Sequence, residues 1–157
     1  MPTKKLKFLL KDSLLRTLEN SIGTKLFRNS FYIIGGKRED ILGNGRLSCA
    51  IFVSSILYIF KLIRDVHATV DGTIRDLEAS DWRRVRSPRP GDVLIWEPLR
   101  FADGSEHGHI GFYIGSNMAV SNSLRQGCPA KHHYTYGIKK GRPARKIIAI
   151  YRSRKLK

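Results

Sequence analysis

Acidic residues are scarce in this sequence and absent from its C-terminal part. The chain of 157 residues carries 29 Lys and Arg against 13 Asp and Glu, which gives a formal net charge of +16. No Asp or Glu follows Glu106, whereas eleven Lys and Arg do. This imbalance predicts a surface that attracts polyanions such as nucleic acid, anionic lipid or an anionic polymer, although a basic face that is merely solvated has the same composition.

Cysteine and long apolar runs are scarce as well. Cys49 and Cys128 are the two cysteines, which excludes a disulfide framework as the basis of the fold. The longest apolar stretch, 51–60, is shorter than a membrane span and contains two serines. The apolar run "FLL" near the N-terminus is too short for the core of a signal peptide. We therefore expect no membrane span and no standard secretion signal, which leaves the location open: cytoplasmic, or released by another route.

The periodicity of apolar residues changes part-way along the chain. Helical spacing predicts helices over about residues 10–22, 49–63 and within 69–80. The stretch "SFYIIGG" suits a short strand or tight turn, and "KREDILGNG" reads as a polar loop. After the break at "SPRPG", strands are predicted at 92–98, 109–115, 118–123 and 145–153. Helices that lead and an antiparallel sheet that follows make the class α+β.

The stretch "NGRLSCAIFV" places a thiol at the start of the second predicted helix. Ser48 or a neighbour can cap that helix. The free amides and the helix dipole are expected to lower the pKa of the Cys49 thiol and to hold an oxyanion. His109, which opens a strand later in the chain, is the candidate base. The alternative is a cysteine that only packs, because free cysteine is among the most buried residue types.

Three short blocks of the sequence resemble known motifs, and they occur in the same order as those motifs. They are "YIIGG" at 32–36, "LSCAIFV" at 47–53, and "RPGDVLIW" followed by "GHIGFYIGSNMAVSNS", which ends at 123. The first resembles a Tyr-x-x-Gly-Gly segment and the second an Asp-Cys-Ser-Gly-Phe-Val block. The third resembles a Pro-Gly-Asp strand and a His-Val-Gly-Ile-Tyr-x-Gly hairpin. Together they resemble the NlpC-type cysteine peptidases, a papain-like family that mostly cleaves peptides of bacterial cell walls.

The resemblance implies a fold and a set of roles. The fold would be papain-like and of NlpC type, with N-terminal helices packed on an antiparallel sheet. One domain would cover residues 1–157, divided into an N-terminal helical extension (1–30), an NlpC-like core (31–123) and a basic C-terminal loop and strand (124–157). Cys49 would be the nucleophile, His109 the general base, and Tyr32 a residue that lines the substrate site near the thiol or the oxyanion. Asp92, after Pro-Gly, is expected to shape a turn.

The third catalytic residue is where the sequence departs from the family. The family places a polar residue, usually His, twelve positions after the catalytic His, and Ser121 stands there with Asn122 beside it. A two-residue turn at 116–117 would pair Asn122 with Gly111, on the same face as His109, and a three-residue loop would place Ser121 there. The amide carbonyl of Asn is the better acceptor for an imidazole N–H, so we favour Asn122 and keep Ser121 as the alternative.

The remaining histidines and the second cysteine do not suggest a metal site. His107 and His109 form His-x-His, and His132 and His133 lie near Cys128, but zinc-binding spacings such as C-x-x-C are absent. His132 and His133 are expected to shape the rim of a cleft together with the nearby tyrosines, or to pack. Cys128 does not open a predicted helix and is expected to be a bystander. No metal and no cofactor are expected.

Two functions from different classes follow. The first is a cysteine hydrolase that cleaves an amide bond through a thioester acyl-enzyme, with a peptidoglycan-like peptide as the expected substrate. Transfer of the acyl group to an amine uses the same machinery and stays open. The second is a non-catalytic basic module on the same fold that binds nucleic acid or an anionic polymer. In either case, the basic C-terminal surface is a possible contact for an anionic polymer.

Overall fold

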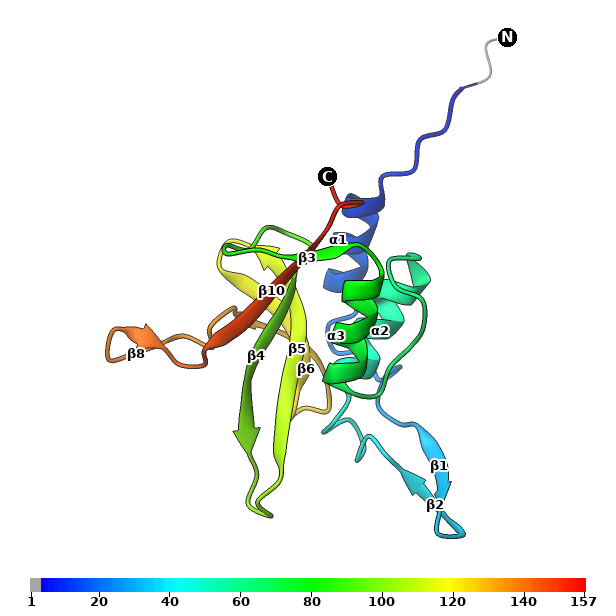
Figure 1. Cartoon of the computed structure of the whole chain (residues 1–157), viewed down its shortest axis with the longest axis vertical. Coiled ribbons are helices and arrows are strands. Elements are labelled where there is room, and N and C mark those ends of the chain that lie inside the picture. The colour runs from blue at the N-terminus through cyan, green and yellow to red at the C-terminus, as the bar shows by residue number, and fades with distance from the viewer. Residues whose placement is uncertain (1–3) are drawn as a thin grey trace.

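The chain passes from helices to strands, as the sequence predicts. The computed structural model describes residues 4–157, and in this part α1 (Leu10–Asn20), α2 (Cys49–Ile59) and α3 (Val70–Ala79) lie on one side of an antiparallel sheet (Figure 1). The class is therefore α+β. No helix within residues 4–157 combines the length and the apolar character that a membrane span requires.

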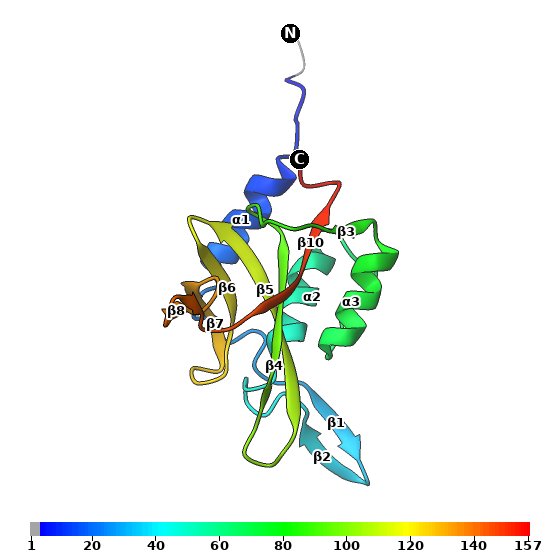
Figure 2. The same ribbon diagram turned by 60° about the vertical axis from the view of Figure 1, so that its left-hand side comes forward.

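The main sheet has six strands in the order β3-β10-β4-β5-β6-β7, and all neighbouring strands are antiparallel. Their bounds are β3 (Trp82–Arg84), β4 (Val93–Arg100), β5 (Glu106–Gly115), β6 (Met118–Ser123), β7 (Cys128–His133) and β10 (Ile147–Ser153). The four predicted strands are confirmed as β4, β5, β6 and β10. The last of these is an inner strand between β3 and β4, so the basic C-terminal segment is part of the sheet (Figures 1 and 2).

Two short hairpins lie outside the main sheet. They are β1 (Phe31–Ile34) with β2 (Lys37–Asp40), and β8 (Ile138–Lys139) with β9 (Arg142–Pro143). The polar loop expected over 37–45 therefore begins with a strand. The β1–β2 hairpin projects from the body of the molecule in both views, and all four residues of β1 are exposed (Figures 1 and 2).

The core lies between α2 and the sheet. Leu14 and Leu18 of α1 and Phe52 of α2 are fully buried there, and the Phe52 ring meets the Phe112 ring of β5 edge-on with 6.0 Å between centroids. Burying each such side chain stabilises the fold by about 1.5–3 kcal/mol before entropy is counted. This packing fixes the start of α2 relative to β5 and β6.

A bulge sets the register of β5 and β6. Ser116 and Asn117 form a two-residue turn, the first of the two alternatives, with positive φ angles of 51° and 60°. An irregularity between Tyr113 and Gly115 then inserts one extra residue into β5. As a result Gly111 pairs with Ser121, not with Asn122.

Candidate active site

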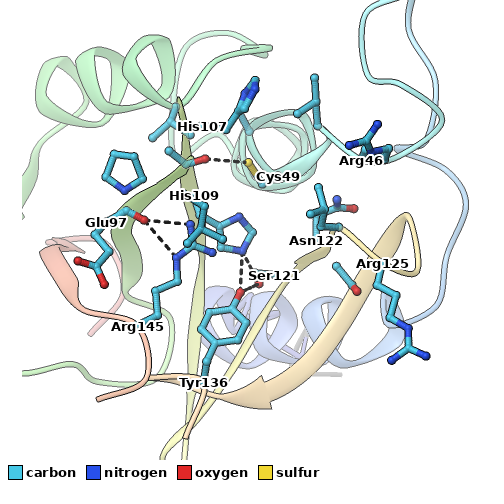
Figure 3. Close-up of a pocket in the computed structure, with 18 of the residues that line it drawn as sticks. Arg46, Cys49, Glu97, His107, His109, Ser121, Asn122, Arg125, Tyr136 and Arg145 are labelled. Atoms are coloured by element: carbon cyan, nitrogen blue, oxygen red, sulfur yellow. Dashed lines mark hydrogen bonds between the residues drawn. The ribbon is translucent and has the colours of Figure 1, made fainter. Parts of the chain in front are cut away.

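A pocket of about 1140 Å³ opens between the start of α2 and the sheet. It is larger than the clefts that usually hold one small ligand, and it has room for several residues of a peptide. Segments far apart in the sequence line it, and its walls include Cys49, His109, Ser121, His132, Tyr136 and Arg145 (Figure 3).

A carboxylate organises the loop that leads to Cys49. Asp40 accepts hydrogen bonds from the amides of Ser30, Leu42 and Asn44 at 2.8–3.1 Å, and from the side chain of Asn29. Burial alone would raise the pKa of Asp40, but these donors lower it to about 2. The loop is thereby held in one conformation by a charged acceptor over most of the pH range.

Asn122 has a structural contact in place of the expected catalytic one. Its Nδ2 donates to the carbonyl of Gly45 at 2.6 Å, which ties β6 to the loop before Cys49. Gly45 has a φ of +92°, and a Cβ there would overlap the carbonyl of Gly127, so the two loops meet backbone to backbone. The preference for Asn122 as the partner of His109 is wrong for this structure, because the bulge in β5, and not the length of the turn, decides the register.

Cys49 opens α2, as the sequence predicts, but its thiol is not activated in the way expected. Ser48 occupies the N-cap position, yet its buried hydroxyl makes no cap hydrogen bond and has no partner among residues 4–157. The Cys49 Sγ–H points to the carbonyl of Gly108, at an Sγ–O distance of 3.9 Å. Burial raises the pKa of this thiol, although the amides of Ile110 and Ala50 oppose the rise. Desolvation therefore exceeds the effect of the helix start, and the resting group is a thiol.

His109 lies on β5 with one ring nitrogen fully engaged. Its Nε2 is 2.9 Å from the Ser121 hydroxyl and 2.8 Å from the Tyr136 hydroxyl (Figure 3). The ring also packs on the indole of Trp96, with 5.1 Å between centroids. Burial, followed by the positive charge of Arg145, lowers the pKa of His109 to about 3, so the ring is neutral at physiological pH.

The backbone carbonyl of His133 fixes the direction of the hydrogen bonds. It lies 2.8 Å from His132 Nδ1 and can only accept, so that nitrogen carries the hydrogen. Burial lowers the pKa of His132, which leaves the ring neutral and Nε2 free to accept from the Ser121 hydroxyl at 2.7 Å. Having donated its hydrogen, the Ser121 oxygen can only accept, so its 2.9 Å contact with His109 is a hydrogen bond only if His109 Nε2 carries the hydrogen. The Tyr136 hydroxyl can then accept from the same Nε2–H and donate to the Ser121 oxygen at 3.1 Å.

This chain of donors assigns the tautomer of His109. With the hydrogen on Nε2, the lone pair lies on Nδ1, the nitrogen that faces neither Ser121 nor Tyr136. In Figure 3, Cys49 lies on the side of the His109 ring opposite Ser121 and Tyr136. Nδ1 is therefore the nitrogen available to take the proton of the Cys49 thiol.

Tyr32 does not contribute to this pocket. It lies on β1, with 53% of its surface exposed, and is not part of the pocket wall. The expectation that it lines the substrate site is wrong for this structure, because the hairpin that carries it projects away from the sheet. The tyrosine hydroxyl at the site comes from Tyr136, which holds a positive φ of 59° in the turn after β7.

Arg145, just before β10, was not expected at the site. Its Nε and Nη2 donate to the carbonyl of Glu97 at 3.1 and 2.9 Å, and the guanidinium lies over the Tyr136 ring at 5.7 Å from the centroid. In the sequence, Arg145 is recognisable only as a cation at the start of a predicted strand. The basic C-terminal part of the chain contains many such cations. Nothing local distinguishes it from Lys146, which is exposed.

The other residues singled out in the sequence take no part in the hydrogen bonds around Cys49 and His109, although His107 lines the pocket. Asp92 accepts from the Arg89 amide at 2.7 Å and pairs with Arg152, which confirms its role in the turn. His107 contacts the Ser105 hydroxyl, and Cys128 opens β7. Within residues 4–157, no group of three or more His, Cys, Asp or Glu side chains is arranged to hold a metal ion.

Comparison with known proteins does not assign a family. No protein-family model matches the chain, and no curated protein matches it. The resemblance to NlpC-type peptidases therefore stays a prediction from the sequence.

Proposed function

We propose that this protein is a cysteine acyl hydrolase with a papain-like, NlpC-type arrangement. The observation that carries the proposal is the hydrogen-bond chain from His133 through His132 and Ser121, which leaves Nδ1 of His109 as a base beside Cys49. A cysteine that only packs needs no such arrangement.

The first half-reaction transfers the acyl group to sulfur. The Cys49 proton leaves the Gly108 carbonyl and moves to Nδ1 of His109 as the sulfur attacks the substrate carbonyl carbon. In this proposal, the amides in the first turn of α2, which have no acceptor within the helix, stabilise the oxyanion. The imidazolium then returns the proton to the departing amine as the C–N bond breaks, which leaves a thioester.

The second half-reaction restores the enzyme. His109 takes a proton from water, the hydroxide attacks the thioester carbon, and the sulfur departs and recovers its proton. Ser121 and His132 act as positioning residues: Ser121 accepts from Nε2–H of His109, and His132 accepts from the Ser121 hydroxyl. Together they hold the neutral ring in one tautomer and keep an acceptor on Nε2–H when the ring is charged. Both groups start neutral, so this is general-base catalysis and not a preformed thiolate–imidazolium pair.

The substrate proposed is an amide in a peptidoglycan-like peptide. The support is the size of the pocket and the sequence blocks that surround Cys49 and His109. The bond type is tested with peptides from digested cell walls, by following the release of new amino groups.

The nucleophile is tested with p-nitrophenyl acetate, which needs no knowledge of the natural substrate. We expect a burst of p-nitrophenol and one acetyl group on Cys49 by mass spectrometry. Cys49→Ser and His109→Ala should abolish the burst. Cys128→Ser is the matched control, since it removes the other thiol, and it should retain the burst.

Acetylation of Cys128 alone, or none at all, would contradict the hydrolase. An inert Cys49 together with retention on heparin that persists at high salt would favour the non-catalytic basic module.

A further inference from the structure

Arg145 is a partly buried cation at the active site without an acidic partner. Within residues 4–157, ion pairs of arginine involve Arg16, Arg100 and Arg152, and none involves Arg145. Glu97, whose backbone carbonyl Arg145 contacts, uses its side chain to accept from the amide of Lys146 at 2.9 Å. The charge of Glu97 acts on Arg145 without forming an ion pair, and burial still lowers the pKa of the guanidinium. A bound anion would offset this cost of removing the cation from water.

The guanidinium also has donors to spare. Of its five N–H groups, Nε and Nη2 each use one on the Glu97 carbonyl. The carbonyl and the Tyr136 ring hold the group in place. The remaining donors belong to a rigid fork at the wall of the pocket, in the geometry that suits a carboxylate.

We infer that Arg145 forms a carboxylate-binding subsite, so that the preferred substrate is an acyl compound with a carboxylate close to the bond that Cys49 attacks. The inference rests on the proposed function, because it names the substrate class of the same nucleophile. It deepens that proposal, since nothing in the Cys49–His109 arrangement by itself requires a charged substrate.

Binding at this subsite is coupled to the base. The titratable and charged groups around His109 are Cys49 from α2, His132 from β7, and Tyr136 and Arg145 from the segment between β7 and β10. Arg145 is the permanent cation among them, and its charge is the second cause, after burial, that holds the pKa of His109 low. A bound carboxylate offsets that charge and makes His109 a stronger base when substrate is present.

The experiment compares two alkylating reagents of nearly equal size, iodoacetate and iodoacetamide. In each, the Cys49 sulfur displaces iodide at carbon, and the thiol proton passes to solvent. Rates are measured by intact mass in a Cys128→Ser background at mildly alkaline pH. We expect the iodoacetate-to-iodoacetamide rate ratio to fall about tenfold in Arg145→Gln, the size of a charge-assisted hydrogen bond. Glutamine keeps an N–H donor for the Glu97 carbonyl.

Arg142→Gln is the matched control. It makes the same change of charge three residues away on exposed β9, outside the pocket wall, and should leave the ratio unchanged. Arg145 can also act on the thiol by charge alone, which would slow both reagents equally when it is removed. An unchanged ratio in Arg145→Gln would overturn the subsite, whatever happens to the separate rates.

A binding measurement separates this inference from the hydrolase proposal. N-acetylglycine and its uncharged amide are titrated into the unmodified protein while the NMR signals of the Trp96 indole and the His109 and His132 rings are followed. Saturable shifts with the acid alone support the subsite even if Cys49 proves inert to both reagents, in which case only the nucleophile proposal fails. No shift with the acid, or equal shifts with both compounds, would overturn the subsite, and this holds even if Arg145→Gln does not fold.

Discussion

Lowering the pH should destabilise the protein because His109 is held neutral in the folded state. The pKa of its ring falls from 6.5 to about 3 on folding. Between these values the unfolded chain binds a proton that the folded chain does not. The contribution of His109 to the free energy of unfolding is therefore fully present above pH 6.5, where the ring is neutral in both states. It is lost as the pH falls from 6.5 toward 3.

The size of the effect follows from the shift. One proton bound only by the unfolded state costs at most about 1.4 kcal/mol per pH unit, or about 2.7 kcal/mol over two units below 6.5. The ring keeps some exposure, so solvent screening reduces this, and we expect about 1–2 kcal/mol from His109. Burial shifts the pKa of His132 in the same direction and adds to the loss.

The assay is urea unfolding followed by tryptophan fluorescence at several pH values above about 4.5. This range avoids the titration of Asp40 and Asp76. Folding lowers the pKa of each carboxyl from 3.8 to about 2, so the stability that each contributes is lost only as the pH falls from 3.8 toward 2. His109→Gln should reduce the slope of unfolding free energy against pH by about 1 kcal/mol per pH unit. Ser121→Ala, which keeps the ring, should retain most of the slope. An unchanged slope in His109→Gln would refute the reasoning.

Three further predictions concern the hairpin of β5 and β6. Gly111→Ala should lower the free energy of unfolding, measured in urea, by about 1–3 kcal/mol, because the new Cβ would lie 2.6 Å from the Ser121 Cβ. Gly108→Ala is the control: the nearest atom to its new Cβ is 3.5 Å away, so this change should cost less. Equal costs would contradict the close approach. Ser121→Ala should slow acylation by p-nitrophenyl acetate about tenfold or more, because His109 Nε2 loses one of its two hydroxyl partners and its link to His132. Asn122→Ala should instead lower stability by about 1–3 kcal/mol, with the rate of the folded protein nearly unchanged, and the opposite pattern would restore Asn122 as the partner.

The sequence by itself determined the local elements and the place of the nucleophile. Apolar residues at helical spacing and the polar run before them put a helix start at Cys49, where the structure has it. Alternating apolar runs with Gly, Ser and Asn between them predicted β6 at 118–123 and a turn before it, and left the length of that turn open between two and three residues. These features depend on backbone propensity and on the burial of one face of each element. Both are determined by residues that are close together in the sequence.

Tertiary structure alone decided which side chains meet at Cys49. One extra residue in β5 shifts every pair beyond it, and so places Ser121 and not Asn122 beside His109. His132 reaches Ser121 because β7 pairs with β6. Arg145 reaches the pocket because β10, which follows it, pairs with β4, the strand that carries Glu97. The pKa of the thiol likewise rises because the whole fold buries it, which outweighs the helix start. Contacts and desolvation between distant segments produce no periodic pattern in the sequence. They depend on which segments meet when the chain folds.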